Sequence, residues 1–290
     1  MGEQSDRPRR PDCIDNYLAI DIVRKVGKKY GPKSIMTFGG EPLLYPKTVS
    51  AIHRKATDVG IPIRDIITNG FWSKNIEEIR VIANELAESG VNNVAISVDC
   101  FHQEFIPLDI VKITAKSLLR AGIPNIRWNP CWLVSREHDN PYDRRTKAIL
   151  EELKVLPIKE DEGNKVQPEG RAILWLKDFL PPRNRIPKGK CGDLPYTERL
   201  DRISSISVEP NGDISICKDF SIGNASRSDI IDILENYDPF KIPETRTIIE
   251  DGVEGLMVLA MGKGVELDPE GYYSICHMCS DIRRRLRACD

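Results

Sequence analysis

The feature that most constrains this chain is a regular alternation of short β-rich runs with longer helical patterns. The helical patterns repeat apolar residues at steps of three or four, and several stop at a glycine, as the first one does at Gly31. Such alternation predicts an α/β fold whose parallel strands are joined by right-handed crossovers. Helices are expected at 14–30, 48–59, 75–89, 108–120 and 142–155, and strands at 34–38, 63–68, 93–98, 125–134 and 165–175.

The character of the sequence changes after Leu180, where a segment rich in proline and basic residues reads as a linker. Beyond it, two β-rich runs flank Glu209-Pro210-Asn211-Gly212, which predicts a β-hairpin. Short helices are expected at 229–236 and 282–288, whereas 239–271 shows no clear pattern. The sequence therefore predicts an α/β domain at 1–187 and a small α+β domain with a hairpin at 188–290.

Composition excludes several classes of function. The 290 residues include 42 Lys+Arg and 44 Asp+Glu, and the formal charge of −2 gives no support for nucleic-acid binding. No apolar run reaches about 18 residues, and the N-terminus lacks an apolar signal core, so we expect a cytoplasmic protein without a membrane span. In that reducing setting the eight cysteines indicate metal or redox chemistry more than disulfides. The oligomeric state is not indicated by the sequence.

Ligands of parallel sheets bind beyond the carboxyl ends of the strands, so the residues that follow each strand are the candidate site. The first strand runs into Gly39-Gly40-Glu41-Pro42. The glycines let a ligand approach the main chain, Glu41 can bind an ammonium group, and Pro42 stiffens the turn. A simple tight turn between strand and helix is the alternative interpretation.

Polar residues also end the next strands. Thr68 and Asn69 follow the second strand, where a β-turn is the alternative to a ligand contact. Ser97 and Asp99 share one face of the third strand and are expected to point inward. A ribose hydroxyl pair would suit Asp99, but Asp99 could instead cap the following segment. Asn129 shares its face of the fourth strand with Arg127 and Cys131.

Candidate roles or positions can be given for three further residues. His102 follows the third strand and is a candidate substrate contact. Arg171 could bind a carboxylate through its two-pronged guanidinium, or be a solvated surface residue. His53 lies in a predicted helix and is expected on the surface.

The ordered combination of these motifs resembles the radical S-adenosylmethionine (SAM) superfamily over residues 14–180. The resemblance implies a partial (β/α) barrel whose Gly-Gly-Glu motif, here Gly39, Gly40, Glu41 and Pro42, binds the methionine amino group of SAM. It implies that Ser97 and Asp99 reach the SAM ribose, and it places Gly170-Arg171-Ala172 on the sixth strand near the methionine. The full implied SAM-binding set is Gly39, Gly40, Glu41, Pro42, Thr68, Asn69, Ser97, Asp99, Asn129 and Arg171.

The sequence departs from the family at its defining motif. That motif, C-x-x-x-C-x-x-C, holds a [4Fe–4S] cluster, and no such spacing occurs among the 290 residues, where only Cys13 lies near the N-terminus. One explanation is that the first strand and the cluster loop lie upstream of Met1, in a longer protein. The other is a degenerate member that lost the cluster; we favour the first. In either case the sequence predicts that this chain alone does not cleave SAM reductively.

The cysteines of the second domain resemble the twitch or SPASM extensions of the family. Cys191, Cys217, Cys276 and Cys279 would supply four thiolates to one auxiliary [4Fe–4S] cluster. A structural Cys-four zinc site and unligated buried cysteines are the alternatives.

The function implied by the resemblance is that of a radical SAM enzyme. Such an enzyme uses a [4Fe–4S] cluster and SAM to form a 5′-deoxyadenosyl radical, and the cysteine-bearing extension suggests a peptide or protein substrate. The rival interpretation is a non-catalytic SAM-binding or scaffold protein derived from the same fold, with a structural metal site. SAM-binding measurements would separate the two, because a scaffold need not retain SAM.

Overall fold

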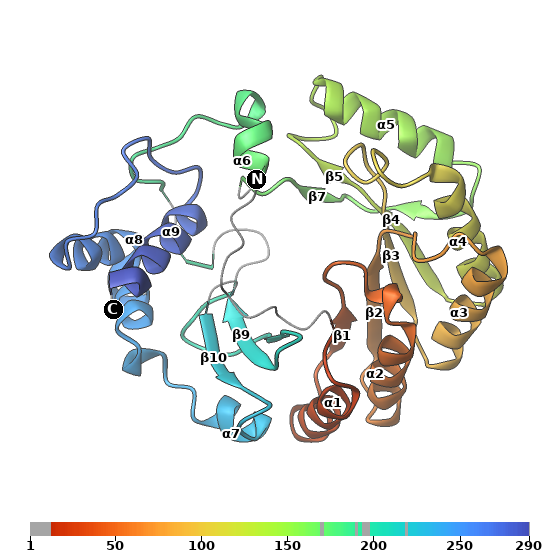
Figure 1. Cartoon of the computed structure of the whole chain (residues 1–290), viewed down its shortest axis with the longest axis horizontal. Helices are drawn as coiled ribbons and strands as arrows, with labels where there is room; N and C mark the ends of the chain where they lie inside the picture. Colours follow the sequence, from red (N-terminus) through yellow and green to blue (C-terminus); the bar gives the residue numbers. More distant parts are fainter. Residues whose placement is uncertain (1–12, 169–170, 189–190, 193–197, 218–219, 290) are drawn as a thin grey trace, which may run out of the picture. The chain divides into compact units, whose positions relative to one another are not determined.

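The structure is a computed structural model that describes residues 13–168, 171–188, 191–192, 198–217 and 220–289 (Figure 1). The chain divides into two compact units, residues 13–166 and residues 167–290. The division falls after Val166, whereas the boundary expected from the sequence lies after residue 187. Residues 167–187 thus group with the C-terminal unit, and each unit is described separately below.

The first unit is a partial (β/α) barrel built on a parallel sheet, which confirms the predicted fold class. The sheet order is β1-β2-β3-β4-β6, and every neighbouring pair is parallel. Its strands are β1 (Ser34–Thr37), β2 (Ile63–Thr68), β3 (Asn93–Ser97), β4 (Asn125–Asn129) and β6 (Lys159–Glu160). Its helices are α1 (Asn16–Tyr30), η1 (Pro42–Leu44), α2 (Pro46–Asp58), α3 (Ile76–Glu88), α4 (Leu108–Arg120) and α5 (Pro141–Leu153). Two short strands, β5 (Cys131–Trp132) and β7 (Asn164–Lys165), form a separate parallel pair.

Local capping explains why the helices begin and end where they do. The Asp15 side chain accepts from the Leu18 amide at the start of α1, and Gly31 closes that helix with a φ of 54°. Asn75 and Asn140 cap α3 and α5 in the same way, each accepting from two backbone amides. These caps are encoded by single residues, so helix positions follow closely from the sequence.

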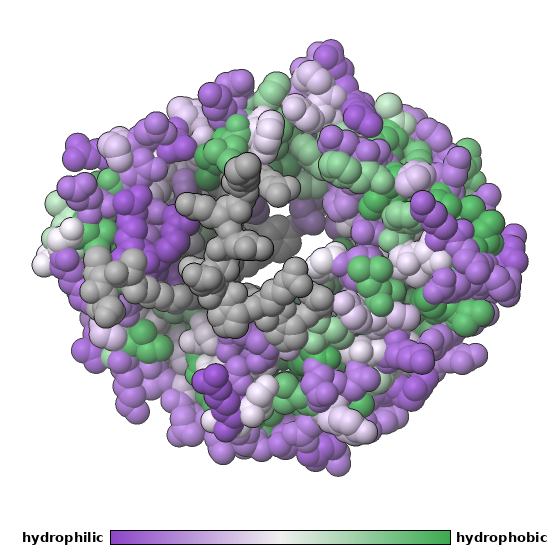
Figure 2. All heavy atoms as spheres, in the orientation of Figure 1, coloured by the Kyte–Doolittle hydropathy of each residue, from purple (hydrophilic) through white to green (hydrophobic). Residues whose placement is uncertain are grey.

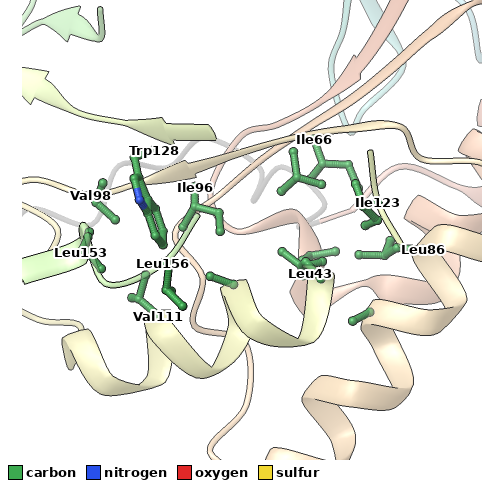
Figure 3. Packing of buried hydrophobic residues seen from close by; sticks show 14 of the residues in the cluster. Leu43, Ile66, Leu86, Ile96, Val98, Val111, Ile123, Trp128, Leu153 and Leu156 are labelled. Atoms are coloured by element: carbon green, nitrogen blue, oxygen red, sulfur yellow. The ribbon is translucent and has the colours of Figure 1, made fainter. Parts of the chain in front are cut away.

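The hydrophobic core of the first unit lies between the sheet and helices α3, α4 and α5 (Figure 3). Ile66, Ile96 and Trp128 come from three successive strands, and none is more than 2% exposed. Side chains alternate along a strand, so the opposite face of the sheet carries polar neighbours such as Ser97 and Arg127. The apolar face holds the barrel together, and the polar face is left for a site.

The expected strand at 165–175 is wrong. Strand β7 covers only Asn164–Lys165, and Arg171–Trp175 forms helix α6. Pro168 cannot donate to a strand ladder, and the Leu176 amide instead donates to the Ala172 carbonyl at 2.9 Å, as in a helix. The fifth strand of the barrel sheet is β6, which is too short to show a periodic pattern.

The second unit contains an antiparallel sheet in the order β10-β9-β8. Its strands are β8 (Ser207–Val208), β9 (Asp213–Cys217) and β10 (Phe220–Asn224). The predicted hairpin is confirmed: the Gly212 amide donates to the Glu209 carbonyl at 2.8 Å, and Gly212 has a φ of 86°. The helical segments are α6, η2 (Lys177–Phe179), α7 (Ile230–Glu235), η3 (Pro239–Lys241), α8 (Pro243–Gly262) and α9 (Ile275–Cys289).

Helix α8 lies within residues 239–271, the stretch that shows no clear pattern in the sequence. It is interrupted at Gly252, whose φ of 71° and ψ of −162° are not helical. Glycine lowers helix propensity, and the break interrupts the apolar repeat that reveals a helix. This unit has its own core, in which Leu256, Met278 and Ile282 are fully buried.

The face of the molecule shown in Figure 2 is mainly polar. Hydrophilic residues cover most of the face shown in Figure 2, with smaller hydrophobic groups between them. Among the described residues, no helix has the length and apolar composition of a membrane span.

Candidate functional site

A cavity of about 420 Å³ lies where β1, β2 and β3 end in the first unit. This is the edge of a parallel sheet at which ligands are expected. Its lining includes five predicted SAM-binding residues and the predicted substrate contact. The lining residues are Phe38, Gly39, Gly40, Ile67, Thr68, Asn69, Ser97 and His102.

The glycine loop after β1 opens its main chain to the cavity. Gly39 has a φ of 109°, a conformation that other residues rarely adopt. At both Gly39 and Gly40, the space that a Cβ atom would enter has no protein atom within 4 Å. A ligand can therefore approach the backbone of this loop, whose two glycines both line the cavity.

Glu41 ties this loop to the end of β2. Its Oε1 accepts from the Leu43 amide at 3.0 Å and from the Thr68 hydroxyl at 2.8 Å, and its Oε2 accepts from the Asn69 amide at 2.7 Å. Burial raises the pKa of Glu41, and these three hydrogen bonds oppose the rise. A carboxylate has about four acceptor positions, so one remains on Oε2 for a ligand cation.

The turn after β2 has both of the roles that the sequence left open. The Thr68 hydroxyl accepts from the Gly70 amide at 3.0 Å, and the Asn69 side chain accepts from the Phe71 amide at 2.8 Å. These bonds make a turn, as the alternative interpretation held. Thr68 and Asn69 nevertheless line the cavity as well.

Asp99 makes contacts that differ from the inward-facing role expected for it. It is 0% exposed, and its Oδ1 accepts from the amides of Phe101 and His102, each at 3.0 Å. Its Oδ2 accepts from the Cys131 amide at 3.1 Å and lies 2.8 Å from Nδ1 of His102. The capping alternative therefore describes its contacts.

His102 stands between Asp99 and the cavity. Its side chain is 37% exposed and lines the cavity beside the glycine loop. Burial acts to lower the pKa of His102, but the hydrogen bond to Asp99 and the charges of Asp99 and Glu41 outweigh it and raise that pKa.

Two other predicted SAM-binding residues, Asn129 and Arg171, are not among the lining residues. Asn129 ends β4, where its carbonyl accepts from the Val98 amide at 3.3 Å and its side chain accepts from Asn164 at 3.4 Å. Arg171 opens helix α6 in the second unit, and its side chain falls outside the described residues, as do Glu169 and Gly170.

Sequence reasoning missed the apolar part of the cavity. Phe38 and Ile67 line it, and Phe38 is 63% exposed. Their only signal in the sequence is position, because Phe38 directly precedes Gly39 and Ile67 directly precedes Thr68.

A partly buried ion pair on the polar face of the sheet was also missed. Arg127 of β4 donates to Asp65 of β2 at 2.7 Å and to Asp161 at 3.0 Å. Strand β3 lies between β2 and β4, with Asn93 opposite Asp65 and Ala95 opposite Arg127. A long-range pair of this kind leaves no local pattern in the sequence.

The thiols of the first unit do not fit a catalytic iron–sulfur cluster. Cys13 precedes α1, while Cys100 and Cys131 lie beside Asp99. Burial raises the pKa of Cys131 to about 12, which opposes the thiolate form that iron requires. Within the described part of this unit, three thiolates are not gathered in one place.

The predicted metal ligands of the second unit lie near one another. Burial, with smaller effects from the neighbouring thiols of Cys279, Cys217 and Cys276, raises the pKa of Cys191 to about 12. Cys191, Cys217 and Cys279 pack against the same hydrophobic core. Among the described residues, no three His, Cys, Asp or Glu side chains are arranged to hold a metal ion.

Comparison with known proteins gives a match over part of the first unit. Residues 17–128, which contain the glycine loop, the β2 turn and the Asp99–His102 pair, match the family model described as Radical SAM superfamily. This part of the chain is therefore similar to the radical SAM superfamily. The family implies SAM and a [4Fe–4S] cluster as cofactors.

Curated relatives of this part of the chain come from archaea. A protein named probable GTP 3′,8-cyclase from Methanocaldococcus jannaschii is 28% identical over 161 residues, which cover 51% of this chain and 52% of the relative. A protein of the same name from Sulfurisphaera tokodaii is 30% identical over 117 residues, 38% of this chain and 35% of the relative. The chain thus spans about half the length of the first relative and about a third of the second.

A solved structure described as native anSMEcpe with bound AdoMet also resembles the chain. The TM-score is 0.48 and the sequence identity 12%, over 95% of this chain and 89% of the other.

Proposed function

We propose that the cavity of the first unit binds SAM, and that this chain is the SAM-binding part of a radical SAM enzyme. One observation carries the proposal: the glycine loop, the end of β2 and the end of β3 meet at a single cavity. The open space beside Gly39 and Gly40 gives room for a ligand. Oε2 of Glu41 can accept a hydrogen bond from the ammonium group of SAM. Ser97 offers a hydroxyl for the ribose.

We do not propose that the chain cleaves SAM by itself. A reduced [4Fe–4S] cluster supplies the electron for cleavage in this superfamily, and the thiols described in the first unit do not fit it. Formation of 5′-deoxyadenosine by the iron-reconstituted chain would contradict this part of the proposal.

Calorimetric titration with SAM tests the binding. Gly40→Val should weaken SAM binding about tenfold or more, because a side chain forced into an occupied space costs about 1–3 kcal/mol. Gly262→Val is the matched control, since Gly262 also has open space around its Cβ position and lies in the second unit. Equal SAM affinity in the two variants, or no SAM binding by the natural chain, would contradict the proposal.

The substrate class is a separate proposal. The resemblance of the C-terminal cysteines to the extensions of peptide-modifying members supports a peptide or protein substrate. The names of the two relatives support GTP as the second candidate. A thermal shift with GTP, in the presence of saturating SAM, favours the second candidate, and its absence favours the first.

We further propose one metal centre at Cys191, Cys217, Cys276 and Cys279. The grouping of three of these thiols at one core supports it. Iron, zinc and sulfide analysis of anaerobically purified protein separates the alternatives: four irons with sulfide indicate a cluster, and one zinc without sulfide indicates a structural site. Cys276→Ser should lose the metal, and the control Cys13→Ser should keep it. Protein without either metal would contradict the centre.

A further inference from the structure

The pairing of Asp99 with His102 fixes which ring nitrogen of the histidine is available to a ligand. Three backbone amides donate to the Asp99 carboxylate, at 3.0, 3.0 and 3.1 Å, so both of its oxygens act as hydrogen-bond acceptors. Nδ1 of His102 lies 2.8 Å from Oδ2, and it therefore donates its proton to this acceptor. Nε2 is therefore the ring atom left for a partner outside the pair.

The surroundings of His102 favour its charged form. The charged groups that act on it are Asp99 and Glu41, both negative. The thiols of Cys100 and Cys131 lie beside Asp99, and their raised pKa values keep them neutral. A protonated His102 donates from both nitrogens, to Asp99 on one side and to an acceptor on the other. Its preferred partner in the cavity is therefore an anionic group.

The position of Glu41 narrows the choice of anion. Glu41 and His102 lie close enough for the charge of each to act on the other. Glu41 is bonded to Thr68 and Asn69, which line the same cavity as His102. An α-ammonium and an α-carboxylate share one carbon atom, so residues that bind the two must be neighbours of opposite charge. Glu41 and His102 meet that requirement.

We propose that His102 donates a hydrogen bond from Nε2 to the carboxylate of the methionine part of SAM, while Glu41 accepts from the ammonium group. Asp99 is then a positioning residue, which holds the imidazole ring and its Nδ1 proton. The assignment rests on the proposed function, SAM binding at this cavity. It also replaces the expected contact between Asp99 and the ribose, because the protein already occupies both Asp99 oxygens.

Two ligands that differ only in the carboxylate test the assignment. Calorimetry with SAM and with decarboxylated SAM, on the full chain, gives a ratio of affinities. We expect a ratio of about ten or more at about pH 6, the effect of one charge-assisted hydrogen bond. His102→Leu should reduce the ratio to about one and leave the affinity for decarboxylated SAM nearly unchanged. In the natural chain the ratio should fall as the pH rises, because His102 loses its proton; in His102→Leu it should stay flat.

The positioning role of Asp99 has its own readout. Asp99→Asn removes the negative charge, so the ratio should collapse at a lower pH than in the natural chain, while His102→Leu gives no pH response. Circular dichroism verifies that each variant is folded. An NMR titration of His102 in the natural chain measures directly the pH at which this residue loses its proton.

Each outcome decides between defined alternatives. If His102→Leu weakens both ligands equally, the histidine contacts another part of SAM, such as the ribose, and the carboxylate assignment is wrong. If both ligands bind the variant as tightly as the natural chain, His102 does not contact SAM. If the natural chain binds neither ligand, SAM binding itself fails and the assignment falls with it, which the other two results would not imply.

Discussion

At the scale of single residues, His53 shows how burial creates a dependence on pH. It was expected on the surface, but it is 0% exposed, and its Nε2 lies 3.0 Å from the Thr37 hydroxyl. Burial, with a smaller effect from the charge of Arg64, lowers the pKa of His53 from 6.5 to about 4. The unfolded chain therefore takes up a proton at a higher pH than the folded chain does. We expect this residue to cost about 3 kcal/mol of stability between about pH 7 and pH 4.

His53→Gln tests that expectation, because glutamine can bond Thr37 but does not titrate. Urea unfolding of both proteins across this pH range gives their free energies of unfolding. The difference between them should change in favour of the variant as the pH falls. Parallel curves would show that His53 does not titrate in this way.

The candidate site also shows how far single residues can be predicted. Gly39, Gly40, Thr68, Asn69 and Ser97 line one cavity, as expected of parallel strands that bring their last residues to one edge of the sheet. The contacts of Asp99 could not be predicted, because β3 ends at Ser97 and the alternation of faces no longer directs the residues beyond it. Contacts made after a strand ends depend on tertiary packing, which the sequence pattern does not contain.

At the scale of elements, the turns that follow the helices depend on glycines with different surroundings. Gly90 follows α3 with a φ of 89°, and an added Cβ would lie 2.2 Å from the Thr57 hydroxyl. Gly122 follows α4 with a φ of 82° and no atom within 4 Å. Gly122→Ala should cost about 1 kcal/mol for the left-handed backbone alone. Gly90→Ala should cost about 1–3 kcal/mol more, because Thr57 must move and its bond to the Ser89 carbonyl, 3.1 Å long, is disturbed.

Urea unfolding of the two variants measures these costs, with Gly122→Ala as the control for backbone strain. Equal destabilisation would mean that contact with Thr57 is unimportant. The glycines themselves were readable as helix stops, and α4 has the bounds that the sequence predicts. Helix α6 and strand β6 could not be predicted from the sequence, because each is too short to show a hydrophobic repeat of its own.

At the scale of the whole molecule, the two units have separate hydrophobic cores. Trp128 and Trp132 are buried in the first core, at 2% and 3% exposure, whereas Trp175 of the second unit is 77% exposed. Tryptophan fluorescence should therefore follow the unfolding of residues 13–166, and circular dichroism should follow both units. Because a core of its own lets each unit unfold separately, we expect the two curves not to coincide.

The metal proposed for the C-terminal cysteines predicts which of the two unfolding curves should shift when the metal is removed. A bound metal stabilises only the unit that holds it, in proportion to its binding free energy. Removing it with a chelator should lower the denaturant midpoint seen by circular dichroism and leave the tryptophan midpoint unchanged. Cys276→Ser should reproduce the chelated curve without any chelator, whereas Cys13→Ser should not. If both midpoints fell together, the two units would unfold as one, and if neither moved, the cysteines would hold no stabilising metal.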